Sequence, residues 1–279
     1  MSSLITPTFV ASRLHAPDVI LLDATLPPVG VTPRVDTRSQ YLAAHLPGAL
    51  FFDIEELSNT STSLPHMLPT PEQFARDMSR MGVSDGATLV VYEQTDVFSA
   101  PRAWWMLRCF GARNVFLLEG GIRAWMAAGL PVEEGPVDRP PATFHAQLAP
   151  AAVKSLSDMQ KLIAQQAQIL DARSRGRFEG TAPEPRAGLR SGHMPGAVSL
   201  PYTDLIRGNF MKSADELATI FRAKRVDLGE PITTTCGSGV TAAVIALGLE
   251  ICGASQVSLY DGSWAEYAQG NEQVVEGAG

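Results

Sequence analysis

The sequence predicts an α/β protein with two similar domains, each a mainly parallel β-sheet flanked by helices on both faces. Two observations predict this fold class. Short apolar runs alternate with helical stretches along the chain, which is the rhythm of βαβ units. The second half also repeats the first: LLDA at 21–24 returns as ILDA at 169–172, and HLPGA at 45–49 returns as HMPGA at 193–197, each 148 residues later.

The elements of the first half follow from its apolar runs and its turn residues. A strand is expected at 19–24, followed by a short helix from Tyr41 that turns through Pro-Gly into a second strand ending at Phe52. The Ser-, Thr- and Pro-rich stretch 58–71 is expected to be a loop. The remaining elements are a helix at 71–81, a strand at 88–92, a helix at 100–110, a strand at 115–118 and a helix at 122–128.

The domain boundaries are placed at a composition change in the middle of the chain. Residues 133–141 are charged and rich in proline, as linkers often are, and little periodicity follows as far as Pro150. We therefore expect a first domain at 1–135, a linker at 136–152 and a second domain at 153–279. A third repeated motif, LEGG at 118–121 and YDGS at 260–263, keeps the order with an offset of 142.

Composition excludes several classes of function. The formal net charge of −7, without a compensating basic cluster, argues against nucleic-acid binding. Three cysteines do not form a disulfide framework and favour a reducing compartment. No secretory signal and no membrane-spanning run is visible, so a cytoplasmic protein is expected, without a membrane partner. The five histidines show no metal-ligand spacing.

The stretch 232–247 predicts a reactive cysteine. A β-branched strand, Ile232 to Thr235, leads into Cys236, a glycine loop and an Ala-rich helix. In this geometry the backbone N–H groups converge on one point, and Gly237 and Gly239 allow positive φ and a close approach to a ligand. The positive end of the helix favours a thiolate over a thiol.

The other two cysteines and the first domain serve as internal comparisons. Cys109 and Cys252 lie in apolar helical stretches and are expected in the core. An offset of about 143 places Glu93 opposite Cys236, in a loop without glycines. The first domain is therefore expected to be inactive, and the chemistry to lie at the carboxyl edge of the second sheet.

These residues resemble a known family. The motifs YxxxHLPGA at 41–49 and VxxYDGSWxEY at 257–267 resemble the two signatures of the tandem-domain sulfurtransferases, the rhodanese family, and the loop CGSGVT at 236–241 is similar to that of its 3-mercaptopyruvate sulfurtransferase branch. The resemblance covers nearly the whole chain. It implies two rhodanese-like domains, with a persulfide-forming cysteine in the second and no metal or organic cofactor.

The same resemblance implies the donor and the residues that hold it. The thiosulfate branch has Arg and Lys directly after its cysteine, where this chain has neutral Gly237 and Ser238. A loop without cations is poorly matched to a compact dianion. The segment RFEGTAPEPR at 177–186 resembles the family's substrate clamp, which maps onto Arg177 and Arg186. The loop residues expected at the substrate are Gly237, Gly239, Val240 and Thr241.

Several polar residues nearby have weaker indications. Ser238 lies close enough to the nucleophile to orient a substrate or pass a proton, and the resemblance maps a relay onto His66 and Glu55, with Asp53 as an alternative acid. The matched pair His45 and His193 is expected to be structural. The remaining arginines of the segment, Arg173, Arg175 and Arg190, are expected to make ordinary surface contacts, and Trp104 and Trp105 to pack in the core.

The chemistry implied is a two-step sulfur transfer. Cys236 takes sulfur from a small anionic donor, 3-mercaptopyruvate, and passes it to a small thiol, cyanide or a thioredoxin-like dithiol. Three other activities are considered. A thiosulfate sulfurtransferase and a non-enzymatic persulfide carrier or sensor stay open. A Cys-based phosphatase is set aside, because the position six residues after its cysteine, where that chemistry needs arginine, holds Ala242.

Overall fold

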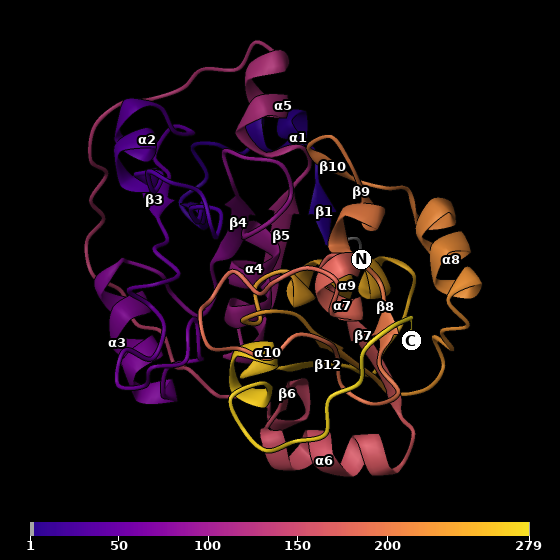
Figure 1. The fold of residues 1–279 in the computed structure, drawn as a ribbon. Coiled ribbons are helices and arrows are strands. Elements are labelled where there is room, and N and C mark those ends of the chain that lie inside the picture. The colour runs from indigo at the N-terminus through magenta and orange to yellow at the C-terminus, as the bar shows by residue number, and fades with distance from the viewer. Residues whose placement is uncertain (1–2, 279) are drawn as a thin grey trace. The chain divides into compact units, whose positions relative to one another are not determined.

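A computed structural model of the chain describes residues 3–278, and these residues fall into two compact units (Figure 1). The first unit comprises the residues up to 60, 68–149 and 208–210. The second comprises 61–67, 150–207 and the residues from 211 onward. Each unit contains one five-stranded sheet in which every pair of neighbouring strands is parallel.

The sheet of the first unit has the strand order β1-β5-β4-β2-β3. Its central strands β2 and β4 are mostly apolar, as expected for a parallel sheet that is covered on both faces. The elements of this unit are β1 (Leu4–Ile5), α1 (Pro7–Ala11), β2 (Val19–Asp23), α2 (Thr37–Ala43), β3 (Leu50–Phe51), α3 (Pro71–Arg80), β4 (Thr88–Tyr92), α4 (Ala100–Cys109), β5 (Asn114–Leu118) and α5 (Gly121–Ala127).

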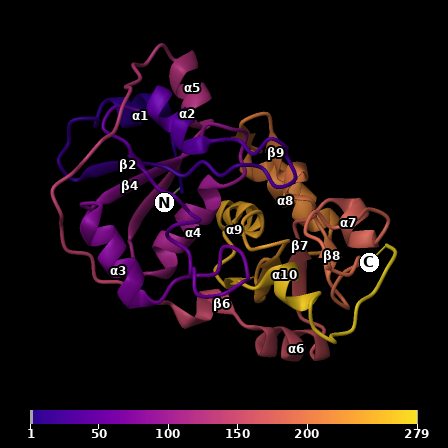
Figure 2. The same cartoon turned by 60° about the vertical axis from the view of Figure 1, so that its left-hand side comes forward.

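Helices cover both faces of this sheet. Figure 2 shows β2 and β4 between α1, α2 and α5 on one side and α3 and α4 on the other. Alternate strand residues divide between the two faces: Leu21 and Val90 pack in one buried cluster with Trp125 of α5. Phe74 of α3 stacks on Phe110 with ring centroids 4.3 Å apart. The sequence predicted the elements from β2 to α5 to within about four residues at their ends, whereas β1 and α1 were not predicted.

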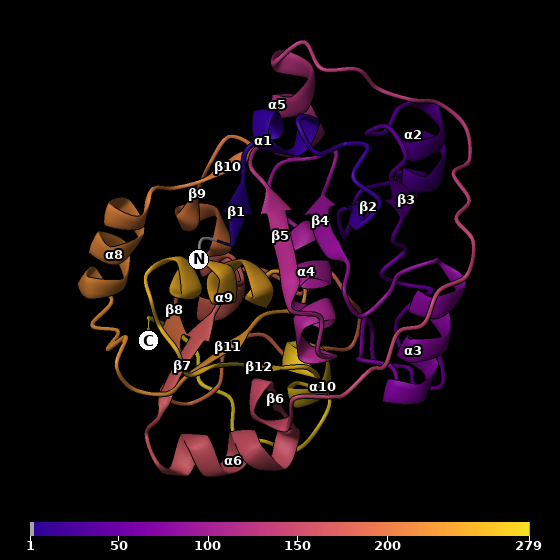
Figure 3. The same ribbon diagram turned by 180° about the vertical axis from the view of Figure 1, so that it is seen from behind.

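The second unit repeats this topology with the order β6-β12-β11-β7-β8. Figure 3 shows β7, β11 and β12 with α8 and α9 on one side and α6 on the other. Its elements are η1 (Pro150–Ala152), β6 (Val153–Lys154), α6 (Leu156–Ala164), β7 (Gln168–Asp171), α7 (Arg175–Glu179), β8 (Val198–Ser199), η2 (Tyr202–Leu205), β9 (Ile206–Arg207), β10 (Phe210–Met211), α8 (Ala214–Ala223), β11 (Ile232–Thr235), α9 (Ala242–Ile251), β12 (Val257–Tyr260) and α10 (Ser263–Tyr267). Of β10, Phe210 is grouped with the first unit and Met211 with the second. The predicted fold class, two α/β domains with mainly parallel sheets, is confirmed.

The stretch expected to be a linker makes ordered contacts. Residues up to 149 group with the first unit rather than standing between the two units. The backbone of Gln147 donates to Phe110 and that of Ala149 donates to Cys109, at 3.1 and 2.8 Å. Phe144 is buried. The proline-rich segment is therefore irregular but fixed by backbone hydrogen bonds. Such contacts leave no periodic pattern in the sequence.

Among the described residues, no helix is long and apolar enough to cross a bilayer.

The loop after β4 contains a buried carboxylate. Glu93 is the first residue beyond the strand, and its two carboxylate oxygens accept hydrogen bonds from the backbone N–H groups of Phe98 and Ser99 at 2.9 and 2.7 Å. The Ser99 hydroxyl adds a third bond at 2.9 Å. Glu93 thus caps the start of α4, where unpaired N–H groups and the helix dipole favour a negative charge. Burial nevertheless raises the pKa of the Glu93 carboxyl to about 7, against the effect of these donors.

This raised pKa predicts a pH-dependent stability. A carboxyl group titrates lower in the unfolded chain, near its ordinary value of 4.5, so ionisation costs stability as the pH rises from there to about 7. The Glu93→Gln variant has no carboxyl group at this position, so its stability should not depend on this ionisation. The unfolding free energy of the wild type should fall relative to the variant by roughly 3 kcal/mol across that interval, as measured by denaturant unfolding at closely spaced pH values. A difference between the two proteins that is constant with pH would contradict this account of Glu93.

Candidate active site

Cys236 lies at the carboxyl edge of the second sheet. It follows β11 directly, and α9 begins six residues later. The backbone N–H groups of Trp264 and Ala265, at the start of α10, donate to the carbonyls of Cys236 and Gly237 at 2.9 and 3.0 Å and hold the loop in place. Within residues 3–278, the N–H groups of 237, 238, 240 and 241 donate to no other group. The loop therefore offers several unpaired donors beside the sulfur, which suits an anion.

Glycine occupies positions 237 and 239 of the loop for different structural reasons. Gly239 has φ +78°, a conformation that other residues adopt only with strain. Gly237 does not have positive φ, so that part of the prediction was wrong. A Cβ at Gly237 would lie 2.9 Å from Nη2 of Arg177 and 3.8 Å from Nη1 of Arg186. Glycine at 237 instead leaves room for the guanidinium of Arg177, which an added Cβ would displace, while Arg186 lies at ordinary contact distance.

Arg177 and Arg186 thus converge on the residues next to Cys236. Arg186 also lies 3.5 Å from the Ser238 hydroxyl, measured from Nη2 to Oγ. Nδ1 of His66 lies 3.0 Å from the same hydroxyl. His66 belongs to the segment 61–67 that packs with the second unit, and its φ of +60° marks an unusual backbone conformation. The structure therefore brings together Cys236, Ser238, His66 and both predicted clamp arginines.

The predicted acidic member of the relay has other contacts. Glu55 forms an ion pair with Arg34, within the first unit. Asp53, the alternative, accepts hydrogen bonds from the backbone N–H groups of Glu55 and Glu56 at 3.0 and 3.2 Å. These contacts give Asp53 the local role of capping a turn. A link from either carboxylate to His66 stays a prediction.

Arg173 is buried, so its expected place on the surface was wrong. Its guanidinium binds Asp171 through Nε and Nη2, Glu184 through Nη1 and the Gly192 carbonyl through Nη2, at 2.7 to 3.1 Å. It also lies 4.1 Å from the ring centroid of Trp264. Burial alone disfavours a charged guanidinium, but Asp171 and Glu184 raise the pKa of Arg173 above its ordinary value. The sequence predicted a solvated loop here because Glu184 and Trp264, which bury Arg173, lie 11 and 91 residues away.

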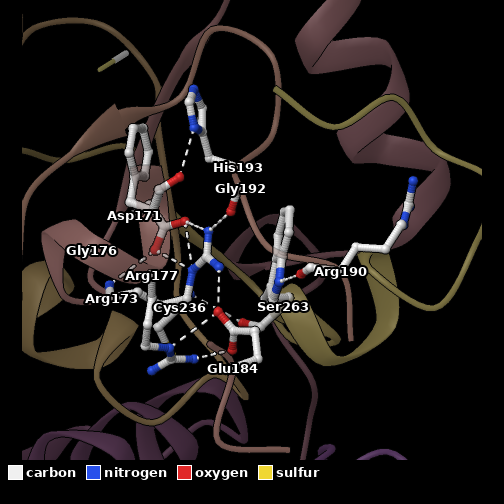
Figure 4. A network of polar contacts seen from close by, with 12 residues as sticks. Asp171, Arg173, Gly176, Arg177, Glu184, Arg190, Gly192, His193, Cys236 and Ser263 are labelled. Carbon is white, nitrogen blue, oxygen red and sulfur yellow. Dashed lines mark hydrogen bonds and ion pairs between the residues drawn. The ribbon is translucent and has the colours of Figure 1, made fainter. Parts of the chain in front are cut away.

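The ion pairs continue from Arg173 through Glu184 to Arg177. Figure 4 shows Arg173 between Asp171 and Glu184, with Arg177 on the far side of Glu184. Glu184 accepts from Nε and Nη2 of Arg177 at 3.1 and 2.5 Å. The side chains of Asp171 and Arg173 are fully buried and that of Glu184 is 2% exposed, whereas Arg177 is 23% exposed. A buried network therefore ends on an arginine that solvent can reach.

The other basic residues of the segment behave differently from Arg173. Arg175 is exposed, as expected. Arg190 donates to the backbone carbonyls of Tyr267, Ala268 and Glu272, at 2.8 to 3.3 Å. It thus satisfies carbonyls at the end of α10 rather than making a surface ion pair.

Burial does not distinguish the three cysteines, but their surroundings do. Cys236 and Cys109 are both 2% exposed. Cys109 lies in α4 in an apolar setting. The loop residues that follow Cys236, in contrast, lie close to the guanidinium groups of Arg177 and Arg186. Cys252 is partly exposed at the end of α9, with its thiol 3.6 Å from the Ala214 carbonyl, so its expected place in the core was wrong. α9 ends at Ile251, and Cys252 follows it as the C-cap residue.

The matched histidines and the tryptophan pair occupy the expected kinds of position. His45 and His193 are buried, and their Nδ1 atoms lie 2.8 and 2.9 Å from the carbonyls of Tyr41 and Phe178. Each imidazole also stacks on the ring of that same residue. Trp104 and Trp105 are buried, which confirms the prediction of core packing.

Two residues near the site had been missed. Ser263 has φ +50° although it is not glycine, and its hydroxyl lies 3.4 Å from the Cys236 nitrogen while donating to the Tyr260 carbonyl at 2.8 Å. Its counterpart in the first unit is Gly121, with φ +55°. The repeat could have indicated Ser263, because it pairs this serine with a glycine, Gly121, at a position of positive φ. Glu184 was the second omission, and its place between two arginines was the indication.

The fold and this site define an α/β protein with a cysteine held in a backbone anion cradle. The sequence matches the rhodanese-like domain at residues 6–128 and 154–269. It is 44% identical over 271 residues to 3-mercaptopyruvate sulfurtransferase of Escherichia coli K12, covering 96% of this chain and 95% of that protein. It is 41% identical over 263 residues to mouse thiosulfate sulfurtransferase, covering 92% and 88%.

A solved structure agrees with these matches. The crystal structure of SseA from Escherichia coli, described as a 3-mercaptopyruvate sulfotransferase with the rhodanese fold, superimposes with a TM-score of 0.87 at 41% identity, covering 95% of this chain and 99% of that one. The chain belongs to the rhodanese-like family, with two tandem domains, and is homologous over nearly its full length to 3-mercaptopyruvate sulfurtransferases.

The buried network generates a stability prediction. Arg173→Met leaves Asp171 and Glu184 buried without their shared cation, which should cost about 3–5 kcal/mol of unfolding free energy. Arg175→Met removes an exposed arginine from the same segment and should change stability by less than about 0.5 kcal/mol. Chemical denaturation of both variants measures this. A loss at Arg173 as small as that at Arg175 would mean that the network contributes little to folding.

Proposed function

We propose that this protein transfers sulfur from 3-mercaptopyruvate to a thiol-type acceptor through a persulfide on Cys236, releasing pyruvate. The observation that supports it best is the convergence of Arg177 and Arg186 on Gly237 and Ser238, beside the cysteine. Guanidinium groups bind carboxylates through paired hydrogen bonds. The donor's carboxylate and ketone would then lie on the arginines while its sulfur faces Cys236.

The first step moves one sulfur atom. The Cys236 thiolate attacks the donor sulfur, so a sulfur–sulfur bond forms and the donor's carbon–sulfur bond breaks. The carbon keeps the electron pair of the broken bond as an enolate. The proton that the donor thiol carried ends on this carbon, which gives the methyl group of pyruvate. The outer sulfur stays on Cys236 as an anion, stabilised by the loop N–H groups at 237–241.

The second step restores the cysteine. A thiolate or cyanide attacks the outer sulfur, the sulfur–sulfur bond breaks, and its electron pair returns to Cys236. Small thiols, cyanide and a thioredoxin-like dithiol can all perform this attack. Neither step requires a metal or an organic cofactor, so activity should survive chelation.

Ser238 and His66 are suited to move the proton in the first step. Their side chains lie 3.0 Å apart, within hydrogen-bond distance. Ser238 would pass the proton toward the enolate carbon, and His66 would orient the serine hydroxyl. Glu55, or Asp53, is proposed as the acid that supports His66.

Thiosulfate remains the second candidate donor. The mouse thiosulfate sulfurtransferase is 41% identical to this chain, close to the 44% identity of the 3-mercaptopyruvate sulfurtransferase of Escherichia coli. Against thiosulfate stands the neutral loop: Gly237 and Ser238 follow the cysteine, so the loop itself offers a compact dianion backbone dipoles but no cation. We also propose the cytoplasm as the compartment, because three free cysteines suit a reducing environment. Fractionation of the source cells tests this.

Replacement of the cysteine tests the proposal directly. The purified protein should release pyruvate from 3-mercaptopyruvate when a thiol is present, and Cys236→Ser should abolish this release. Mass spectrometry after incubation without acceptor should find one added sulfur on the wild type only. Cys252→Ser is the matched control and should keep full activity, because its thiol lies at the end of α9 away from the loop.

Other outcomes would identify the alternatives. Faster turnover of thiosulfate than of 3-mercaptopyruvate would make the protein a thiosulfate sulfurtransferase. Persulfide formation only with a partner protein, without pyruvate, would make it a carrier. Pyruvate release by the Cys236→Ser variant would contradict the mechanism.

A double-mutant cycle tests the proton relay. His66→Gln and Ser238→Ala should each lower kcat for 3-mercaptopyruvate by roughly ten- to a hundredfold with a small effect on KM. Because the two groups act as one unit, the double variant should be little slower than either single one. Independent, multiplicative losses in single-turnover pyruvate release would exclude a shared role.

A further inference from the structure

The hydrogen bonds of Arg177 leave only part of its guanidinium available. A guanidinium has five N–H donors in a fixed plane. Glu184 accepts from Nε and from Nη2 of Arg177, at 3.1 and 2.5 Å. The two Nη1 donors and the second Nη2 donor have no partner among residues 3–278. These three donors form a fork at the end of the side chain, which matches the two oxygens of one carboxylate.

Glu184 is itself fixed by a buried cation. Its side chain is 2% exposed, and Oε1 accepts from Nη1 of Arg173 at 2.8 Å. Arg173 is in turn held by Asp171 at the end of β7. The prolines at 183 and 185 flank Glu184 and restrict its backbone. The carboxylate therefore has a fixed position, and Arg177 is oriented by a rigid partner rather than by solvent.

The network also reduces the charge presented to a donor. Asp171 and Glu184 carry two negative charges, and Arg173 and Arg177 carry two positive charges, so these four side chains balance one another. A carboxylate that lies against Arg177 weakens the field of that arginine at the loop. A compact dianion depends on this field more strongly than a donor with one fixed carboxylate does.

From this geometry we infer that Glu184 is a specificity-determining residue, which turns the free fork of Arg177 toward a carboxylate and offsets its charge against compact sulfur dianions. The inference rests on the proposed function, because it names the feature that favours a carboxylate donor over thiosulfate. Glu184 acts through Arg177, so it is a positioning residue. Its contribution is to the choice between donors and not to the transfer step itself.

Glu184→Gln tests this inference with little change in shape. The amide oxygen can still accept from an arginine, but the negative charge is lost. The ratio of kcat/KM for thiosulfate to that for 3-mercaptopyruvate, with cyanide as acceptor, should rise by about tenfold, since thiosulfate gains from one uncompensated cation near the loop. Added salt should reduce this rise because it screens the charge.

Two further variants separate specificity from a structural role. Glu179→Gln removes a carboxylate from α7 that makes no ion pair among the described residues, and its ratio should equal that of the wild type. Glu184→Asp keeps the charge but withdraws it, so efficiency should fall for both donors with less change in their ratio. If Glu184→Gln proves unstable, Glu184→Asp decides: its ratio should move toward thiosulfate by less than tenfold, because the withdrawn carboxylate offsets Arg177 less well, and an unchanged ratio would contradict the inference.

The outcomes distinguish this inference from the proposed function. A wild type that uses neither donor would refute the proposed function. A wild type that uses 3-mercaptopyruvate, with a ratio unchanged by Glu184→Gln, would refute the role of Glu184 alone. Equal losses for both donors in the Glu184→Gln variant would show that Glu184 only supports the fold.

Discussion

Each unit of this protein places the start of a buried helix just beyond the central strand of its sheet, and such a helix start needs a negative group. Unpaired N–H donors and the helix dipole create this requirement. In the first unit, the carboxylate of Glu93 satisfies it through the amides of Phe98 and Ser99. In the second unit, the equivalent position holds Cys236, and the N–H groups of 237, 238, 240 and 241 donate to no acceptor among residues 3–278. The carboxylate of Glu93 therefore fills this role in the first unit, whereas the N–H groups beside Cys236 in the second unit are available to an anion.

The two halves also differ in what surrounds the matching aspartates. Asp23 lies at the end of β2 and accepts from Thr25 and from the Gln94 amide, at 2.5 and 2.8 Å. Burial raises the pKa of Asp23 above its ordinary value. Asp171, 148 residues later, instead binds the guanidinium of Arg173. The first unit thus has a hydrogen-bond network at this place, whereas the second unit has a chain of ion pairs that ends on Arg177.

The sequence was sufficient for the features with strong local patterns. β4 and β11 were predicted at their observed bounds, since their β-branched and apolar runs have clear ends. The cysteine loop followed from two glycines between a strand and an apolar helix, and the clamp arginines from the family resemblance. The parts that the sequence did not reveal depend on long-range contacts. The burial of Arg173 requires Glu184 and Trp264, which lie 11 and 91 residues away. The same holds for the ordered segment near Phe144, whose backbone donates to Ser79.

We propose that the amides of the loop at 237–241 hold a sulfur anion on Cys236 while Arg177 and Arg186 hold the rest of the donor. A crystal structure of the protein after exposure to 3-mercaptopyruvate, without an acceptor, tests it most directly. The account predicts one additional sulfur atom bonded to Sγ of Cys236, within hydrogen-bond distance of those amides, with no change at Cys109 or Cys252. An unmodified Cys236, or an added sulfur that points away from the loop amides, would contradict it.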